Sequence, residues 1–246
     1  MRKFIAFMLT TATAILFSVP QIAFAYANES EREIKTVAVY DGKNEGVAVL
    51  SGSGENYVTD ALLTVKFDGF TPYTITLCDG YSQYIETFDF GGEDKFLFYS
   101  SQTGGSGGYG SYRIYRLQTD SYELLYDDSY NSETVTFGAV FLPDGFMELR
   151  DGSSGSVLSV YVGYMDKTFY NQIFAPDGSV KGEQPYVNAI SFVSPSLNSS
   201  SGIYRLLTYR SVVAVAEVNR LGYIVETLDF DGKTFAPTFT EFSIAL

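Results

Sequence analysis

The chain of 246 residues contains no histidine, no tryptophan and a single cysteine, Cys78. Without histidine there is no Ser-His-Asp or Cys-His catalysis, no zinc site built on histidine and no haem held by histidine. A lone cysteine forms no intramolecular disulfide, so burial of apolar surface must stabilise the fold. Carboxylate chemistry and non-catalytic binding remain open as functional classes.

Basic residues are scarce, since 16 Lys and Arg stand against 29 Asp and Glu, a formal charge of −13. Removal of Arg2 and Lys3 with an N-terminal leader leaves 14 basic residues and a charge of −15. Such a surface repels nucleic-acid phosphates and anionic lipids, because binding to both relies on Lys and Arg. We therefore expect no nucleic-acid partner. Hydrophobic residues make up 46% of the chain, which indicates a folded protein rather than a disordered one.

The first 25 residues have the pattern of a signal peptide. Arg2 and Lys3 form a basic start, residues 4–19 are mainly apolar, and Ala-Phe-Ala at 23–25 is a small-x-small cleavage motif. The uninterrupted apolar part is shorter than the roughly 20 residues that span a bilayer. We predict a signal peptide over 1–25, a polar lead-in over 26–35 and a single all-β domain over 36–246. The mature protein would be secreted or associated with the cell envelope, without a membrane span.

The rest of the chain consists of short β-like runs separated by turns. Residues 134–141 alternate apolar and polar side chains, whereas residues 157–164 are apolar on both faces, which suits a strand buried between sheets. Asp-Gly between such runs favours type I′ hairpin turns, in which both central residues have positive φ. No helical period is sustained, so we expect antiparallel hairpins and no helix longer than about three turns. The Asp-Gly pairs begin at residues 41, 68, 79, 144, 151, 177 and 231.

The number of β runs, about sixteen at about four per blade, predicts a β-propeller-like fold of about four or five blades of antiparallel strands. A β-sandwich or two small β domains is the alternative. Short sequences also recur along the chain. Phe-Leu-Pro-Asp-Gly at 141–145 returns as Phe-Ala-Pro-Asp-Gly at 174–178, and Phe-Asp-Phe-Gly-Gly at 88–92 is related to Asp-Phe-Asp-Gly-Lys at 229–233. They indicate either a degenerate repeat array or hairpin turns that look alike.

One segment resembles a repeat of the secreted bacterial VCBS/FG-GAP-like proteins. Residues 89–95 read Asp-Phe-Gly-Gly-Glu-Asp-Lys, and an apolar stretch, a Gly-rich loop at 103–109 and Tyr-Arg-Ile-Tyr at 112–115 follow. The resemblance implies a propeller-like fold, usually without an assigned enzymatic activity, and Ca²⁺ ligands at Asp89, Glu93 and Asp94. Phe96 and Leu97 stand where the family has a final acid, which favours a solvated acidic turn over a metal site.

Tyr109, Tyr112 and Tyr115 lie beside the Gly-rich loop in a tyrosine-dense stretch. They predict either cross-strand packing or a rim that stacks on sugars or packs on a partner protein. We expect a non-catalytic secreted domain that binds an extracellular glycan or protein. The alternatives are a structural cell-envelope protein and a small glycoside hydrolase that uses two carboxylates. Acids available for such a pair are Asp127, Asp128, Glu133, Glu148 and Asp151.

Overall fold

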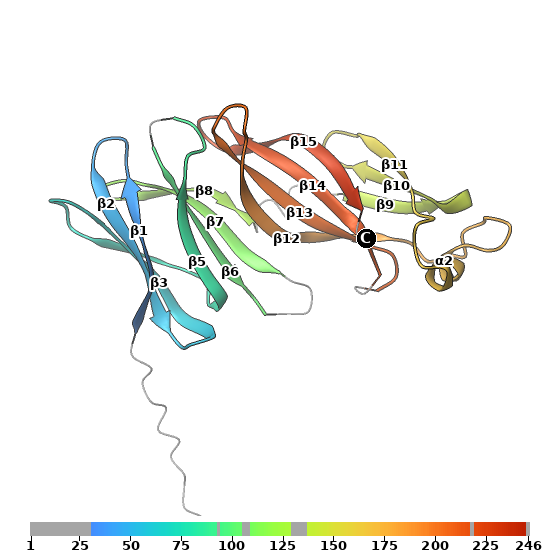
Figure 1. The fold of residues 1–246 in the computed structure, drawn as a ribbon, viewed down its shortest axis with the longest axis horizontal. Helices are drawn as coiled ribbons and strands as arrows, with labels where there is room; N and C mark the ends of the chain where they lie inside the picture. Colours follow the sequence, from blue (N-terminus) through green and yellow to red (C-terminus); the bar gives the residue numbers. More distant parts are fainter. Residues whose placement is uncertain (1–30, 93, 105–108, 129–136, 217–218, 245–246) are drawn as a thin grey trace, which may run out of the picture.

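A computed structural model describes residues 31–92, 94–104, 109–128, 137–216 and 219–244 of the chain. Over these residues the protein is all-β, with three antiparallel sheets and one short α-helix (Figure 1). The predicted all-β class and consecutive hairpins are confirmed. The predicted signal peptide lies outside the described residues and stays a prediction. No helix in the described part of the chain is long and apolar enough to cross a membrane.

The first sheet has eight strands in nearly sequential order, with β4 paired to β3 beside the main path. It folds over itself, because β1 contacts β5 and Lys35 of β1 forms an ion pair with Glu86 of β5 at 2.9 Å. β1 starts at Arg32, which pairs with Gly52, so the end of the predicted lead-in is strand. The strands are β1 (Arg32–Tyr40), β2 (Glu45–Ser53), β3 (Tyr57–Phe67), β4 (Tyr73–Thr76), β5 (Gly80–Phe88), β6 (Phe96–Gln102), β7 (Gly110–Leu117) and β8 (Tyr122–Asp127).

The second half of the chain forms a three-stranded and a four-stranded sheet, which meet where β9 contacts β12. The helix α2 (Lys167–Ile173) was not expected from the sequence, but its seven residues stay within the predicted limit. Asp166 caps it by accepting hydrogen bonds from the N–H groups of Thr168 and Phe169. The other elements are β9 (Phe137–Leu142), the 3₁₀ turn η1 (Pro143–Gly145), β10 (Phe146–Asp151), β11 (Val157–Tyr161), β12 (Tyr186–Leu197), β13 (Tyr204–Val213), β14 (Arg220–Phe230) and β15 (Phe235–Ile244).

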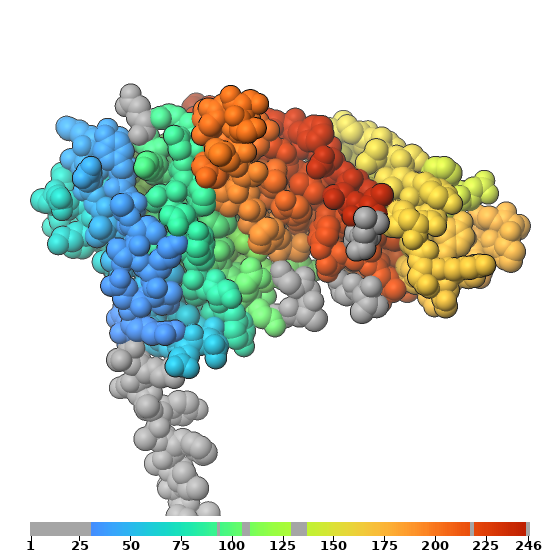
Figure 2. Space-filling model, in the orientation of Figure 1, coloured from blue at the N-terminus to red at the C-terminus, as the bar shows by residue number. Residues whose placement is uncertain are grey.

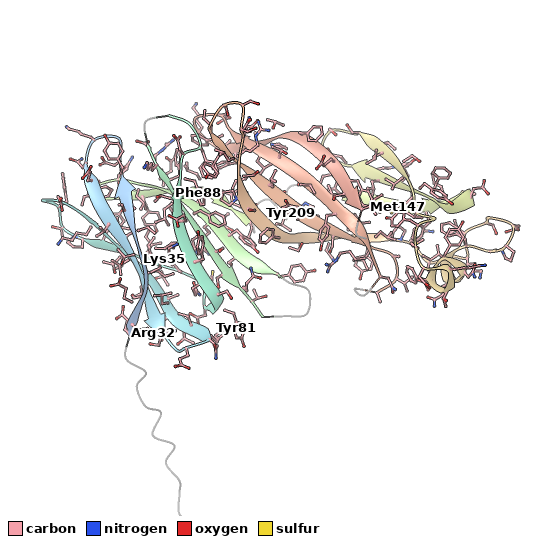
Figure 3. The ribbon with its side chains drawn as sticks, in the orientation of Figure 1. Arg32, Lys35, Tyr81, Phe88, Met147 and Tyr209 are labelled. Carbon is pink, nitrogen blue, oxygen red and sulfur yellow. The ribbon has the colours of Figure 1, made fainter. Side chains whose placement is uncertain are left out.

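Three apolar cores follow one another along the molecule. Figure 2 shows the outer surface that encloses them, and Figure 3 labels Phe88, which packs against the second core, and Met147 of the third. The first lies inside the folded first sheet, and the second joins β6, β7 and β8 to the four-stranded sheet. The third, which contains Met147, lies between the three-stranded sheet, α2 and the four-stranded sheet. Strand β7 contributes side chains to two cores, because Ile114 lies in the second core and Leu117 lies in the first. Strands β6 and β7 are therefore covered on both faces.

The sheets do not form the predicted propeller blades. Within the described residues they contain eight, three and four strands, and none closes on itself. A blade is a sheet of about four strands set radially around an axis, whereas these sheets stack face to face in a row. The sandwich alternative fits the arrangement better. Turn spacing predicts hairpins, but the partition of hairpins into sheets depends on contacts between residues far apart in the chain.

The Asp-Gly turns lie between strands or at strand ends, but most are not the predicted type I′ turns. Only Asp144 and Gly145 both have positive φ, as a type I′ turn requires. In four of the other turns the aspartate side chain accepts hydrogen bonds from the N–H groups that follow it, at Asp41, Asp151, Asp177 and Asp231. Asp231 Oδ1 accepts hydrogen bonds from the N–H groups of Thr234 and Lys233, each at 2.8 Å. These bonds, with that from Thr234 foremost, lower the pKa of Asp231 below its ordinary value.

Candidate binding pocket between two sheets

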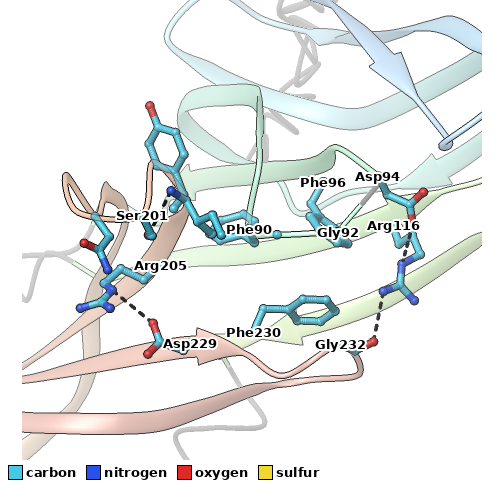
Figure 4. Close-up of a pocket in the computed structure, with 14 residues that line it drawn as sticks. Phe90, Gly92, Asp94, Phe96, Arg116, Ser201, Arg205, Asp229, Phe230 and Gly232 are labelled. Carbon is cyan, nitrogen blue, oxygen red and sulfur yellow. Dashed lines mark hydrogen bonds and ion pairs between the residues drawn. The ribbon is translucent and has the colours of Figure 1, made fainter.

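A pocket of about 530 Å³ opens where three hairpin turns meet (Figure 4). The turns join β5 to β6, β12 to β13 and β14 to β15, and Arg116 of β7 also lines the pocket. The N–H of Tyr204 donates to the carbonyl of Asp89 at 2.7 Å, which fastens the first turn to β13. Because the lining residues run from Phe90 to Gly232 in the chain, the pocket exists only when the two sheets are packed together.

Aromatic rings supply the apolar wall of the pocket. The ring centroids of Phe96 and Phe230 are 5.0 Å apart, and Phe90 lies 5.9 Å from Phe96. Phe90 and Phe96 are buried, whereas Phe230 and Tyr204 are half-buried. The ring surface offered to a ligand therefore belongs mainly to Phe230 and Tyr204.

Arg116 forms one charged end of the pocket. Its guanidinium lies 5.4 Å from the ring centre of Phe96 and 5.5 Å from that of Phe230, in reach of a cation–π contact with each. Its Nε lies 3.3 Å from Asp94 Oδ2, and its Nη1 donates to Glu123 Oε2 at 2.8 Å. These contacts from three elements hold the side chain of Arg116 in one position.

Arg205 and Asp229 form the second charged end. Arg205 Nε lies 3.2 Å from Asp229 Oδ1, and Thr238 donates to the other carboxylate oxygen at 2.9 Å. Both members of the pair are about one-third exposed or more. Within the described part of the chain, the terminal nitrogens of Arg205 have no hydrogen-bond partner, so they are available to donate to a ligand.

The carboxylates of the pocket are engaged by its arginines. Asp94 and Asp229 each form an ion pair with an arginine, at 3.3 Å and 3.2 Å. A glycosidase uses two carboxyl groups that flank the scissile bond, one of them as a proton donor. Burial raises the pKa of Asp128 and of Glu226 above their ordinary values, but neither residue lines this pocket. The carboxylates that do line it are therefore the ion-paired ones.

The carboxylates singled out in the sequence are dispersed. Asp127 lies 3.3 Å from Arg113, Glu148 pairs with Arg150, and Asp151 accepts hydrogen bonds within its own turn. Glu133 lies outside the described residues. The structure therefore brings none of the described members of this set into the pocket.

The predicted calcium ligands take other roles. Asp89 Oδ1 accepts a hydrogen bond from the N–H of Gly91 at 2.8 Å, and Asp94 pairs with Arg116. Glu93 lies outside the described residues. Among the described residues, no three His, Cys, Asp or Glu side chains gather as metal ligands. A guanidinium next to Asp94 also opposes a cation at this turn, because like charges repel.

We predict that micromolar Ca²⁺ will produce no saturable rise in melting temperature. A ligand that binds only the folded state raises its stability by mass action, and a strong Ca²⁺ site needs about six or more oxygen ligands. Thermal unfolding in Ca²⁺ and in Na⁺ at matched ionic strength measures this, since the charge of −13 responds to screening by either ion. A Ca²⁺-specific shift that Asp89→Ala abolishes would contradict the prediction.

The predicted tyrosine rim is largely interior. Tyr112 lies in the second core and Tyr115 in the first, with exposed fractions of 1% and 2%. Both rings are covered because β7 has a sheet packed on each face, which leaves no ring surface for a ligand. Tyr109 is half-buried, and its carbonyl accepts hydrogen bonds from the N–H and Oγ1 of Thr103. None of the three lines the pocket.

Sequence reasoning missed Arg116 and Arg205. A repeated sequence could have identified them. Ile-Tyr-Arg-Leu occurs at 114–117 and again at 203–206, and the arginine of each copy lines the pocket. The related sequences at 88–92 and 229–233 also meet there, through Phe90 and Phe230. The other recurring pair is in contact too, since the rings of Phe141 and Phe174 are 5.5 Å apart. Two of the recurrent sequence pairs thus line the same pocket, and the third pair is in direct contact.

Comparison with known proteins gives one family match. Residues 135–243 are similar to the YybI C-terminal domain. The match covers less than half of the chain and corresponds to the three- and four-stranded sheets. It contains Arg205 and Asp229 but not Asp94 or Arg116, so the pocket joins the YybI-like part to the first sheet. This family differs from the VCBS/FG-GAP-like repeats that the sequence resembles. No curated protein and no solved structure matches the chain.

Proposed function

We propose that the protein is a secreted, non-catalytic binding protein and that the pocket between its sheets holds a sugar unit of an extracellular glycan. One observation carries the proposal: a pocket of about 530 Å³ combines half-buried aromatic rings with two arginine–carboxylate pairs. Small-molecule sites are typically clefts of about 300–1,000 Å³ with apolar walls and a few placed polar groups.

A sugar has both an apolar face and hydroxyl groups, and the pocket offers partners for each. Its C–H face packs on an aromatic ring, and its hydroxyl groups donate to carboxylates and accept from guanidinium N–H groups. Phe230 and Tyr204 offer the ring surface, and Arg205 with Asp229 offers the donors and acceptors. Two arginines and their two partner carboxylates balance in charge, so the site favours a neutral sugar over an anionic one.

A glycan array with the purified mature protein, followed by calorimetry with the best ligand, tests the proposal. Arg205→Ala should weaken binding about 10–100-fold, because a hydrogen bond from a charged group contributes about 1.5–3 kcal/mol. Arg150→Ala is the matched control, since Arg150 forms an exposed ion pair that does not line the pocket. An array without any ligand, or equal affinity of Arg205→Ala and the native protein, would contradict glycan binding in this pocket.

A further inference from the structure

A groove of about 410 Å³ lies between the edge strands β11 and β15, away from the sugar pocket. Val157 and Leu158 of β11 form one wall, Phe239 and Phe242 of β15 form the other, and Phe137 and Ile224 lie between them. We call it the β11–β15 groove. The sequence predicted that 157–164 would be a strand buried between sheets. The structure ends β11 at Tyr161 and leaves Val157 57% and Leu158 45% exposed.

The groove is the open seam between two sheets that meet on their other side. β9 contacts β12, and the opposite edges of the same two sheets are β11 and β15. Among the described strands, β11 pairs only with β10, and β15 pairs only with β14. Each therefore presents one row of backbone N–H and C=O groups without a strand partner. An additional strand would satisfy one of these rows and cover the exposed apolar side chains.

Strand β11 lacks the usual protection against strand addition. Edge strands are commonly guarded by lysines, prolines, bulges or inward-pointing charges. β11 reads Val-Leu-Ser-Val-Tyr and has no charged residue and no proline. β15 is better guarded, because it contains Pro237, Glu241 and a register shift in its pairing with β14. An unguarded edge beside an apolar groove is typical of a site for an extended peptide, so β11 is the edge open to an added strand.

The negative charge of the groove favours a basic ligand. Asp151 and Glu241 line it, and no lysine or arginine does so among the described lining residues. A second copy of this chain would bring the same acidic groups and a formal charge of −13 against it. The first described strand, β1, lies at the other end of the molecule (Figure 1). We propose that the β11–β15 groove receives an extended, basic and apolar segment of a partner protein, which adds as a strand along β11.

Synthetic peptides of about eight residues test this without knowledge of the partner. The probe alternates valine and lysine, a second peptide alternates valine and glutamate, and a third is the lysine peptide with central prolines that prevent strand pairing. Fluorescence anisotropy should show the lysine peptide binding at least about tenfold more tightly than either of the others. Hydrogen exchange of the β11 amides should slow when the lysine peptide is bound and stay unchanged with the proline peptide.

Variants locate the site. Phe239→Ser should weaken binding of the lysine peptide about tenfold, and Glu241→Gln should reduce its advantage over the glutamate peptide. Phe192→Ser is the matched control, because Phe192 is also an exposed strand phenylalanine but lies on β12 outside the groove. Equal binding of the proline peptide, or no effect of Phe239→Ser, would overturn the proposal. A dimer of the chain alone that protects the β11 amides would overturn it in favour of a second copy.

Discussion

Replacement of Glu226 by alanine will lower the free energy of unfolding by about 3–5 kcal/mol. Glu226 Oε2 lies 3.3 Å from Nε of Arg210, and the two side chains are 6% and 3% exposed. Thr208 donates to the same carboxylate oxygen at 3.4 Å. Alanine removes the carboxylate, whereas the charged guanidinium of Arg210 stays inside the protein. Loss of one partner from a buried ion pair destabilises the fold strongly, because the remaining charge is kept away from water. Urea denaturation followed by circular dichroism measures the loss.

An exposed ion pair provides the control. Arg150 pairs with Glu148, but the Arg150 side chain is 67% exposed. Water and salt screen such a pair, so Arg150→Ala should change the free energy of unfolding by about 0–1 kcal/mol. A similarly small loss for Glu226→Ala would mean that water reaches the Arg210 pair.

The stability contributed by Glu226 should also depend on pH. Burial raises the pKa of its carboxyl above the ordinary value of 4.5, against the opposing effect of Arg210. The folded state therefore holds the proton more tightly than the unfolded chain. This contribution is fully present below pH 4.5 and is lost as the pH rises through the raised pKa. The Glu226→Gln variant has no carboxyl group that titrates at this position. The difference in unfolding free energy between this variant and the native protein should therefore change between pH 4.5 and the raised pKa of Glu226, and stay constant at higher pH.

Replacement of Phe235 by alanine should cost about 3–5 kcal/mol. Phe235 begins β15 and is 7% exposed in the second core. Its ring centroid lies 5.0 Å from that of Phe90, between β5 and β6, and 6.2 Å from that of Tyr126 of β8. The cavity would therefore weaken the junction between the first sheet and the four-stranded sheet. Calorimetry should show one unfolding transition, shifted to lower temperature, if the two sheets unfold together.

The same strand supplies the control for Phe235. Phe239 lies four residues further along β15 and is 58% exposed. Phe239→Ala removes the same ring from the surface, so the free energy of unfolding should change by about 0.5 kcal/mol or less. Two separate transitions in Phe235→Ala would show that the sheets are independent units rather than the single domain expected over 36–246.

The local features of the fold were predictable because they depend on neighbouring residues. Asp-Gly pairs such as Asp231-Gly232 end strands, since glycine adopts positive φ and the aspartate side chain accepts nearby N–H groups. No stretch of the chain sustains a helical period, and the α-helix found among the described residues, α2, has seven residues. Composition in the same way excludes chemistry that requires histidine.

The sequence by itself determined the all-β class, the antiparallel hairpins and the excluded chemistries. Only the tertiary structure decided which strand faces are covered. Tyr112 and Tyr115 became core residues because sheets pack on both faces of β7, whereas Val157 and Leu158 stayed exposed because β11 is an edge strand whose only partner in the described chain is β10. The pocket likewise needs Arg116 and Arg205, which are far apart in the chain, to line the same cavity. Such contacts arise from packing between distant segments, and the alternation of side chains along one strand carries no information about them.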